Sequence, residues 1–448
     1  MKIIFSNHLG HIDGSGRRTH LLRDWSGAMI PGNIVYPPVE MLYAAAYLRA
    51  HGCEVGLVDG NARHLSRART VAEIKKGRPD CVLTVSSWFT LHDDLAFFRA
   101  VKEAMPGCLT IVAGPNVTLE PALALRSRDV DYVALGEFMD GAREIMSGRP
   151  RQNAAYREDG RVVVTPSVPI EPLDRIPFAA WDLVDRSLYW VPFGKRHPFA
   201  LALAGVGCPH AKCTFCHQAS YFGEPYRPHS PGYVIAEMDC LISMGFREVI
   251  YRDQCFTACR GTVEALCRHL IARGRPVTWR VSTRVDRVDR ELLALMASAG
   301  CYQVSFGFES LSDAALARCR KGVTSADGER AASWAKEAGL ELSGGFIVGL
   351  PGEEQRPTRE WLRLIRRRGV DFLQVFPFNF VYDAERRRFH PYFEGSEILR
   401  ENRRRQRELL LSFYLDPRYL AGQARRVIAR EGFKRLPDFF LDFLRYVL

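Results

Sequence analysis

Short apolar runs alternate with helix-like segments along the first 145 residues. Apolar residues recur with helical spacing in two segments, 38–50 and 95–105. Uninterrupted apolar runs of four to six residues are typical of strands that are buried on both faces. We therefore predict strands at 2–6, 54–59, 81–85, 109–113 and 132–135. Strands that alternate with helices form a parallel sheet, which binds ligands at the carboxyl ends of its strands.

A second alternating series begins at Phe199. Its pattern predicts six strands and five helices between them. The strands are expected at 199–204, 248–252, 277–282, 303–306, 342–348 and 372–376, and the helices at 233–244, 263–272, 290–299, 326–338 and 358–368. Six strands with crossover helices indicate a partial (β/α)6 barrel, whose site lies at the carboxyl ends of the strands. The predicted fold class is therefore α/β.

The two series also set the expected domain boundaries. The N-terminal Rossmann-like domain is predicted at 1–145 and the barrel at 199–382. Between them, residues 146–198 are rich in Pro and Arg with weak periodicity, as in a connector. Residues 383–448 are predicted to form a helical, basic C-terminal region.

Composition excludes several classes of protein. The 448 residues are 47% hydrophobic and 25% charged, which is ordinary for a globular protein and argues against disorder. No run reaches the roughly 20 apolar residues of a membrane span, and the N-terminus lacks a secretory signal, so a cytoplasmic protein is expected. The 12 cysteines are too sparse for a disulfide scaffold. Closely spaced thiols in such a protein point to metal binding or catalysis.

Three cysteines fall within nine residues, just after the first strand of the second series. They are Cys208, Cys213 and Cys216, in the sequence GCPHAKCTFC. On a loop at the carboxyl end of a strand, three thiols can converge on one metal site. Thiolates suit zinc or an iron–sulfur cluster. A structural zinc site needs four ligands, and His210 and His217 are the candidates for the fourth.

The cysteine cluster and the strands that follow it resemble the radical SAM superfamily. The resemblance continues through YRPHSP (226–231), YRDQCFT (251–257), STRVD (282–286), GCYQVSFGFES (300–310) and GGFIVGLPGE (344–353). It implies that the three cysteines hold a [4Fe–4S] cluster whose open iron binds S-adenosylmethionine (SAM). One electron from the cluster then cleaves SAM to a 5′-deoxyadenosyl radical. The chain departs from the family in one respect, because four residues rather than three separate the first two cysteines.

The same resemblance implies further residues for the SAM site. Phe215 matches the aromatic residue that packs near the adenine, and Glu309 ends the fourth strand, where the family contacts SAM. Thr283 and Arg284 end the third strand, where a cation can meet the SAM carboxylate. The next strand matches a Gly-x-Ile-x-Gly pattern whose small residues let the adenine approach the backbone. The matching positions are Gly345, Ile347 and Gly349.

Asp253 and Cys255 are the candidate catalytic residues. Asp253 is expected either to contact SAM or the substrate, or to cap the following helix. At the next position the family often has a second acid, which Gln254 replaces here. Cys255 and Cys259 lie near the same rim. They are either incidental thiols or a pair with a redox or substrate-binding role.

The first domain resembles the cobalamin-binding-type (B12-binding) domain that precedes the radical SAM core in one large subfamily. The matching stretches are YPPVEMLYAAAYLRAHGCEVGLVDGN (36–61), RPDCVLTVSS (78–87), IVAGPNVTLEPA (111–122) and VDYVALGE (130–137). In some cobalamin proteins a His in an Asp-x-His-x-x-Gly loop ligates cobalt. We place the corresponding loop at 59–64, where Asn61 stands in the ligand position and His64 is a surface residue. A fold does not guarantee its cofactor, so bound cobalamin stays an open question.

The predicted function is that of a radical SAM enzyme that abstracts hydrogen from a small-molecule substrate. The altered cysteine spacing and the missing His favour dehydration or deoxygenation of a hydroxylated natural product, with an aminoglycoside of antibiotic biosynthesis as the example. The resemblance here is to radical SAM diol dehydratases, which are lyases. The alternative is a cobalamin-dependent C-methyltransferase. The alternative of another class is a zinc- or RNA-binding protein.

The net charge of +11 concentrates near the C-terminus. From residue 385 to the end the chain has 15 Lys and Arg against 9 Asp and Glu, including the triplets 386–388 and 403–405. Two explanations are a solvated helical face and a docking surface for an acidic electron donor of the flavodoxin or ferredoxin type. Nucleic acid is not an expected partner, because no recognition module accompanies the charge.

Overall fold

The computed structural model divides the chain into two compact units, Met1–Pro192 and Phe193–Leu448, which are treated separately below. It describes residues 1–8, 20–21, 29–30, 35–88, 90–191, 194–216, 226–353, 356–378, 380–383, 388–391 and 397–431. Three residues that the sequence analysis singled out, His217, Arg386 and Arg387, lie outside the described residues. Of the helices that the structure describes, none combines the length and the apolar character that crossing a membrane would require.

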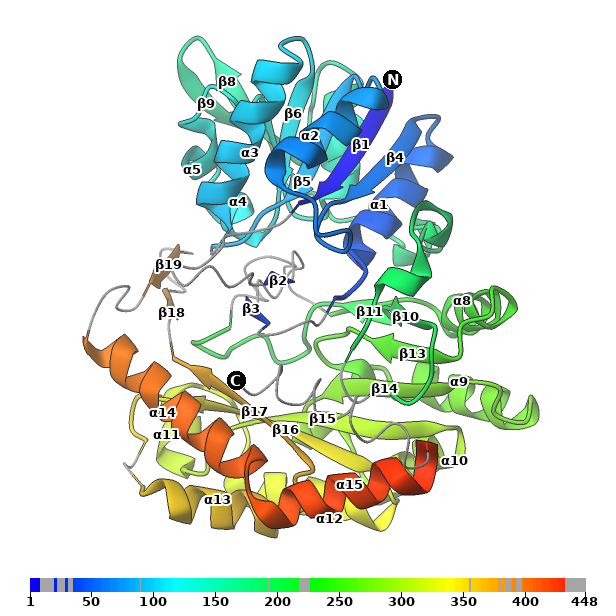
Figure 1. The fold of residues 1–448 in the computed structure, drawn as a ribbon, viewed down its shortest axis with the longest axis vertical. Coiled ribbons are helices and arrows are strands. Elements are labelled where there is room, and N and C mark those ends of the chain that lie inside the picture. Colours follow the sequence, from blue (N-terminus) through cyan, green and yellow to red (C-terminus); the bar gives the residue numbers. More distant parts are fainter. Residues whose placement is uncertain are drawn as a thin grey trace. The chain divides into compact units, whose positions relative to one another are not determined.

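The first unit is built on a seven-stranded sheet with the order β4-β1-β5-β6-β7-β8-β9 (Figure 1). The first five strands in this order are parallel, and β8 and β9 add to the sheet in antiparallel pairing. The strands are β1 (Lys2–Asn7), β4 (Glu54–Asp59), β5 (Cys81–Val85), β6 (Leu109–Ala113), β7 (Tyr132–Ala134), β8 (Ala154–Glu158) and β9 (Arg161–Val164). The predicted parallel Rossmann-like sheet is confirmed.

Helices cover both faces of this sheet because its strands are apolar on both sides. On one face, Ile4 and Val82 pack against Ile74 of α2 and Phe97 of α3. Alternate strand residues such as Phe5 are also fully buried, beneath α1 and α6, which pack against each other. The helices are α1 (Val39–Ala50), α2 (Arg67–Lys76), α3 (Leu91–Ala104), α4 (Pro115–Leu119), α5 (Ala122–Leu125) and α6 (Phe138–Met146).

Part of the expected connector belongs to the first sheet. β8 and β9 form a hairpin, and its turn residues Asp159 and Gly160 have φ values of 49° and 74°. Asp-Gly is a preferred pair for such a turn, since both positions need positive φ. The hairpin was missed because β8 has few apolar residues and the apolar run of β9 is only three residues long. Three short 3-10 helices follow, η1 (Leu173–Arg175), η2 (Trp181–Leu183) and η3 (Arg186–Leu188).

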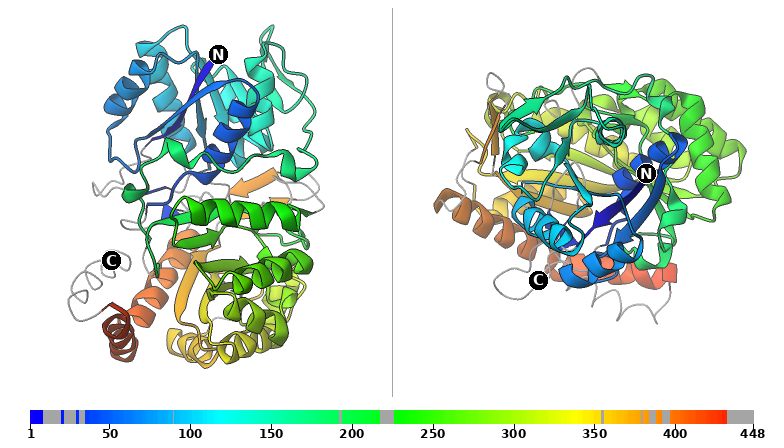
Figure 2. Two further views of the ribbon diagram at one scale, coloured as in Figure 1. Left: turned by 90° about the vertical axis from the view of Figure 1, so that its right-hand side faces the viewer. Right: turned by 90° about the horizontal axis from the view of Figure 1, so that it is seen from above.

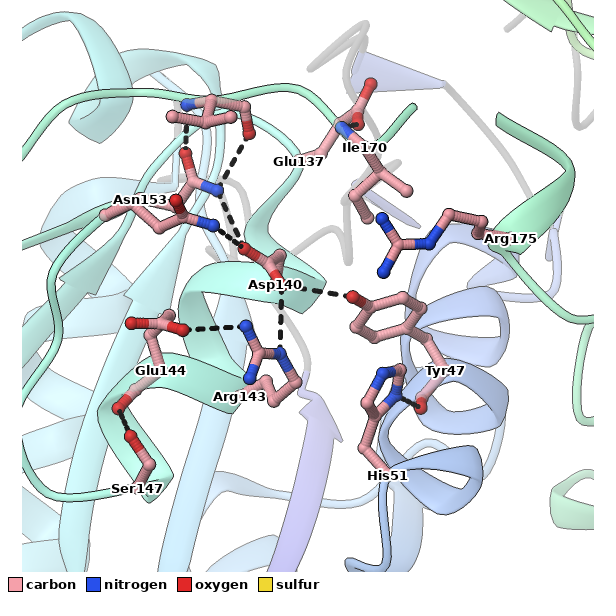
Figure 3. A network of polar contacts seen from close by, with 12 residues as sticks. Tyr47, His51, Glu137, Asp140, Arg143, Glu144, Ser147, Asn153, Ile170 and Arg175 are labelled. Carbon is pink, nitrogen blue, oxygen red and sulfur yellow. Dashed lines mark hydrogen bonds and ion pairs between the residues drawn. The ribbon is translucent and has the colours of Figure 1, made fainter. Parts of the chain in front are cut away.

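A polar network fastens α1, α6 and the segment before β8 to one another (Figure 3). Its centre is Asp140 of α6, which is 5% exposed. The Asp140 carboxylate accepts hydrogen bonds from the Tyr47 hydroxyl (3.0 Å), Arg143 Nε (3.0 Å), Gln152 Nε2 (2.8 Å) and Asn153 Nδ2 (3.1 Å). Burial alone would raise the pKa of Asp140, but these donors outweigh it and lower the pKa.

The second unit is built on a six-stranded parallel sheet with the order β10-β13-β14-β15-β16-β17. The sheet is open, with β10 and β17 at its edges, so the predicted partial (β/α)6 barrel is confirmed. Its strands are β10 (Phe199–Ala202), β13 (Glu248–Tyr251), β14 (Thr278–Thr283), β15 (Cys301–Glu309), β16 (Glu341–Val348) and β17 (Phe372–Pro377).

Crossover helices cover the outer face of the second sheet (Figure 2). They are α8 (Pro231–Ser243), α9 (Arg260–Ala272), α10 (Arg290–Ser298), α11 (Asp313–Arg318), α12 (Ser325–Glu337) and α13 (Thr358–Arg367). Five of these six helices were predicted, and α11 was missed because it is only six residues long. The short elements of the second unit are η4 (Phe256–Ala258), η5 (Val285–Arg287), β11 (Gly205–Val206), β12 (Arg227–Pro228), β18 (Phe380–Asp383) and β19 (Arg388–Pro391). The first unit also contains the short strands β2 (His20–Leu21) and β3 (Met29–Ile30).

The C-terminal helix α14 (Glu397–Tyr414) covers the edge strand β17. The Tyr414 hydroxyl accepts a hydrogen bond from Leu373 N (3.0 Å) and donates one to Leu373 O (2.8 Å). Gln406 Nε2 donates to Val375 O (2.7 Å). Backbone groups on the outer side of an edge strand have no neighbouring strand, so these side chains take the place of one. A last helix, α15 (Pro417–Glu431), follows, as expected for a helical tail.

Candidate active site

Three thiols lie on the loop that follows β10 and β11. Cys208, Cys213 and Cys216 are free and partly exposed, and Gly207, with a φ of 90°, turns the chain into the loop. Burial raises the pKa of the Cys213 thiol, and the cations of Lys321 and Arg284 oppose part of the rise. Because the thiolate is the form that binds metal, a thiol close to two cations is suited to be a ligand.

The chemistry of the donor set, three thiols on one loop, suits an iron–sulfur cluster, which is held by Cys thiolates. In the part of the chain that the structure describes, no group of three or more His, Cys, Asp or Glu side chains could hold one metal ion. His210, a candidate fourth zinc ligand, uses its Nε2 in a hydrogen bond to Arg320 O (2.6 Å). That nitrogen of His210 is therefore engaged by the chain itself.

A buried ion pair lies beside Cys213. Lys321 Nζ is 2.7 Å from Glu309 Oε1, and the two side chains are 7% and 14% exposed. Burial alone would lower the pKa of Lys321, but the negative charges of Glu309 and Cys213 outweigh it and raise the pKa. The ammonium also lies 6.0 Å from the centroid of the Phe215 ring. Lys321 thus joins two predicted residues, Glu309 and Phe215, and was itself missed.

Glu309 has a strained backbone. Its φ is 63°, in the left-handed region, where β15 shifts its register against β16. A residue with a Cβ pays roughly 1–2 kcal/mol for this conformation. Such outliers cluster at functional sites, where the surrounding structure enforces them. The strain and the ion pair together fix where the carboxylate of Glu309 lies.

Thr283 and Arg284, at the end of β14, are already engaged by the protein. Arg284 is 4% exposed and makes two hydrogen bonds to the Asp286 carboxylate, at 2.8 and 3.0 Å. It donates a further one to Lys321 O (3.0 Å). The Thr283 hydroxyl is hydrogen-bonded to the Thr257 hydroxyl. Both residues lie at the expected strand end, with Arg284 fixed against Asp286 and the turn at Lys321.

Asp253 and Gln254 bind the backbone of the segment that follows β10 and leads into the cysteine loop. Both oxygens of the Asp253 carboxylate lie within hydrogen-bonding distance of Ala204 N, at 3.1 and 3.0 Å. Burial raises the pKa of Asp253 to about 7, and backbone donors oppose part of the rise. Gln254 Oε1 accepts a hydrogen bond from Gly207 N (3.0 Å). The alternative that Asp253 caps the next helix is wrong, because the N-cap residue of α9 is Cys259.

Cys255 is fully buried next to the third strand. Its Sγ lies 3.4 Å from the Thr283 hydroxyl, and burial raises the pKa of the thiol. The neighbouring Cys259 accepts a hydrogen bond from the Thr262 hydroxyl at 3.3 Å. A catalytic role for Cys255 therefore stays a prediction, and the environment resembles that of a small buried hydrophobe.

The three predicted residues of β16 have different surroundings. Ile347 packs with Cys319, and Phe215 of the cysteine loop packs against the same cluster. A Cβ added to Gly345 would come no closer than 3.6 Å to the surrounding chain, so the protein itself does not require a glycine there. At Gly349, by contrast, φ is 85° and a Cβ would lie 2.3 Å from the Asn402 side chain of α14. Gly349 is thus explained by the chain's own packing.

At the carboxyl edge of the first sheet, the expected cobalamin loop is tied down by its aspartate. Asp59 is 5% exposed and accepts hydrogen bonds from Asn7 Nδ2 (2.9 Å), the Tyr189 hydroxyl (2.8 Å) and Ala62 N (2.8 Å). Burial raises the pKa of Asp59, and these donors oppose the rise. Asn61 is buried in the loop, and His64 is exposed, as expected of a surface residue.

Small and short polar residues form the rest of this edge. Gly114, with a φ of 126°, brings the ends of β5 and β6 so close that a Cβ would lie 2.0 Å from Ser86 O. Asn116 Nδ2 donates to Ser86 Oγ (3.2 Å) and Ser87 O (2.9 Å). His8, which was missed, follows β1, with its Nε2 3.0 Å from Asp94 Oδ1. These polar residues are buried and pair with one another, so they fix the strand ends at the edge where such a sheet binds its ligand.

Comparison with known proteins identifies both halves of the chain. Residues 32–146 match the B12 binding domain family, and residues 203–372 match the radical SAM superfamily. An uncharacterized methyltransferase of Pyrococcus horikoshii is 28% identical, over 75% of this chain and 75% of its own length. The anaerobic magnesium-protoporphyrin IX monomethyl ester cyclase of Rubrivivax gelatinosus is 30% identical, over 76% of this chain but 63% of the cyclase. Cytidylyl-2-hydroxyethylphosphonate methyltransferase of Streptomyces wedmorensis is 26% identical, over 70% and 69%.

Two solved structures have a similar fold. One is the radical SAM methyltransferase TsrM from Kitasatospora setae, with cobalamin and a [4Fe–4S] cluster bound, at a TM-score of 0.65 and 16% identity, covering 85% of this chain and 72% of TsrM. The other is the cobalamin-dependent SAM radical enzyme OxsB, at a TM-score of 0.65 and 16% identity. The match covers 84% of this chain and about half of OxsB, 53%. At this identity the likeness establishes the fold.

Proposed function

Since this chain is a radical SAM protein with an N-terminal B12-binding domain, we propose that it is a cobalamin-dependent radical SAM methyltransferase acting on a small molecule. The observation that carries the proposal is the presence in one chain of a three-thiol loop at the carboxyl end of β10 and a match to the B12-binding domain over residues 32–146. Two relatives along most of the chain are named methyltransferases. These names favour methyl transfer over the dehydration of a hydroxylated natural product that the sequence analysis preferred.

Each cofactor has a matching set of residues. When bound, the [4Fe–4S] cluster supplies the electron for SAM cleavage and cobalamin supplies a carrier for a methyl group. Cys208, Cys213 and Cys216 would hold the cluster through their thiolates. The carboxyl edge of the first sheet would hold cobalamin, and Ser86 and Asn116, which are fully buried, would fix the strand ends that shape this edge.

Around the thiols, the chain's own residues are suited to bind and orient SAM. The ammonium of Lys321 and the guanidinium of Arg284 provide positive charge that stabilises thiolates, and both are themselves paired, with Glu309 and with Asp286. Phe215 and Ile347 supply an apolar wall for a flat ring. Gly345 leaves backbone that a ligand can approach. These features agree with a site for SAM.

An electron donor of the flavodoxin or ferredoxin type is the proposed protein partner. On α14, Arg400, Arg403, Arg404 and Arg407 are exposed and recur at intervals of three and four residues, which places them on one face of the helix. An acidic partner would be steered toward such a face. The buried residues of α14, Leu399, Leu409 and Phe413, lie on the other side and fix the helix to the sheet.

Two measurements on the purified, anaerobically reconstituted protein test the proposal. Titration with hydroxocobalamin should saturate near one cobalamin per chain. With SAM and a reductant, cobalamin-loaded protein should release S-adenosylhomocysteine, the product left when SAM gives up its methyl group. Protein that retains no cobalamin, or that releases the same S-adenosylhomocysteine without it, would overturn the proposal.

A second candidate function rests on the cyclase relative, which is 30% identical over 76% of this chain. The name of this relative describes ring formation, a reaction that requires no added methyl group. The same assay separates the two candidates, since ring formation requires no S-adenosylhomocysteine. Production of 5′-deoxyadenosine alone by cobalamin-loaded protein would favour this candidate.

A further inference from the structure

We propose that His210 fastens the cysteine loop to the turn at residues 319–322 and is a positioning residue for the cluster. The inference rests on the radical SAM cluster and not on methyl transfer. It assigns a role to the departure in spacing, in which four residues separate Cys208 from Cys213. The longer segment must be held somewhere, and His210 lies inside it.

The hydrogen bond of His210 has one direction. His210 Nε2 lies 2.6 Å from Arg320 O, and a carbonyl oxygen can only accept, so the ring donates from Nε2. The next residue, Ala211, has a φ of 46°, a left-handed conformation that is costly for a residue with a Cβ. This local strain is offset only if the loop gains contacts elsewhere, and the bond to Arg320 is such a contact.

The turn that receives the ring is shaped for it. Gly322 has a φ of 74°, and a Cβ there would lie 2.6 Å from His210 Cε1. The imidazole therefore occupies the space where a side chain at position 322 would stand. A second bond, from Thr214 N to Cys319 O (3.1 Å), attaches the loop to the same turn on the other side of Cys213.

The same turn carries the buried cation of the site. Lys321 lies between Arg320, which accepts from His210, and Gly322, which makes room for the ring. Its ammonium is paired with Glu309 beside Cys213. By holding the loop to this turn, His210 fixes Cys213 relative to Lys321. Residues that orient metal ligands in this way typically change metal affinity by about 10- to 100-fold when they are removed.

The test compares His210→Ala with two further variants in the full-length protein. His210→Gln keeps an N–H donor at a similar reach, and Lys212→Ala removes an exposed side chain from the same loop as the matched control. After anaerobic reconstitution, iron loss to a chelator should be at least tenfold faster in His210→Ala. His210→Gln should restore most of the retention, and Lys212→Ala should match the wild type.

Electron paramagnetic resonance of the reduced cluster provides a readout that general destabilisation does not move. Adding SAM should change the spectrum of the wild type and of Lys212→Ala, and should change it less in His210→Ala at equal cluster content. Gly322→Ala should lose iron faster, as His210→Ala does, because its Cβ displaces the ring. The double variant His210→Ala/Gly322→Ala should be no worse than the worse single variant, since both changes break the same contact.

The proposal fails if His210→Ala holds iron as long as Lys212→Ala and responds equally to SAM. It also fails if the effects of His210→Ala and Gly322→Ala multiply in the double variant. These outcomes are distinct from failure of methyl transfer, because iron retention and the spectrum need neither cobalamin nor a substrate. If His210→Ala does not fold, Gly322→Ala and His210→Gln still decide the question.

Discussion

At the level of single residues, the ion pair between Lys321 and Glu309 is the contact on which the second unit's site most depends. Both side chains are nearly buried, and Lys321 lies close enough to Cys213 for their charges to interact. Removing one member of a buried pair leaves the other charge without compensation, which typically costs about 3–5 kcal/mol. Replacing both members leaves no uncompensated charge.

We expect Lys321→Met to lower the thermal stability of the second unit strongly, by about 3–5 kcal/mol. The double variant Lys321→Met/Glu309→Gln should recover part of this loss. Lys76→Met is the matched control, because Lys76 and Glu73 form an equally short but exposed pair, and it should leave the melting temperature unchanged. Equal melting temperatures for Lys321→Met and the control would contradict a buried, structurally important pair.

Asp253 predicts a pH dependence. Burial raises its pKa in the folded protein to about 7, above the usual value of 3.8. The folded state then binds the proton more tightly than the unfolded state, so this residue's contribution to stability is full at acid pH. It is lost as the pH rises toward 7. We expect the melting temperature of Asp253→Asn to fall less steeply with rising pH than that of the wild type between pH 4 and about 7. Parallel profiles would refute the raised pKa.

Single residues also show which members of the candidate site could be predicted from the sequence. Phe215 and Glu309 were predicted from a family resemblance, and the structure brings them together around Lys321. Lys321 itself gave no signal, because it follows Arg318 and Arg320 in a basic stretch where any one cation looks like a surface residue. Only the tertiary fold, which buries one of these cations, distinguishes it.

At the level of elements, the strands were more predictable than the segments that join them. β4, β5 and β6 begin and end at the predicted residues, and the apolar runs of β5 and β6 are buried on both faces. α2 and α6 were missed. Half of the ten residues of α2 are charged, and α6 is a short helix of nine residues. Tertiary packing rather than local pattern stabilises both helices.

Helix α14 is expected to protect the edge strand that it covers. Tyr414→Phe removes the hydroxyl that serves both Leu373 N and Leu373 O, which should cost about 1–3 kcal/mol. Hydrogen exchange at the Leu373 amide should accelerate, while Ser412→Ala, an exposed change in the same helix, should leave it unaltered. Unchanged exchange in Tyr414→Phe would show that the hydroxyl does not replace a neighbouring strand.

The network at Asp140 is expected to stabilise the first unit (Figure 3). Asp140→Ala leaves the donors of Tyr47, Gln152 and Asn153 without their acceptor, so the free energy of unfolding should fall by about 2–4 kcal/mol. Because the pKa of Asp140 is lowered in the folded state, its contribution is present at neutral pH and is lost as the pH falls through that pKa.

Denaturant unfolding at several pH values measures this contribution. The difference between wild type and Asp140→Ala should be largest at neutral pH and should shrink in acid. Glu103→Ala, which removes an exposed carboxylate of α3, is the control and should be neutral. A difference that does not vary with pH would rule out an ionised Asp140 as its source.

At the scale of the whole molecule, the excess positive charge lies near the C-terminus. Of the described elements, α14 combines five arginines with three glutamates, and four of these arginines are exposed. Replacing Arg400, Arg403 and Arg404 by Glu should slow reduction of the cluster by an acidic flavodoxin severalfold at low ionic strength. Reduction by a small chemical reductant should be unaffected. A rate with flavodoxin that is independent of these charges would leave the solvated face as the explanation.

The central claim is that one chain joins radical SAM chemistry to a methyl-carrying cobalamin. It is tested most directly by measuring both SAM products by mass spectrometry in a single anaerobic reaction with cobalamin and a reductant. We expect 5′-deoxyadenosine together with S-adenosylhomocysteine, and we expect that replacing Cys208, Cys213 and Cys216 by Ser abolishes the 5′-deoxyadenosine. Formation of 5′-deoxyadenosine without S-adenosylhomocysteine would contradict methyl transfer, and persistence of 5′-deoxyadenosine in the triple variant would contradict cluster binding by these cysteines.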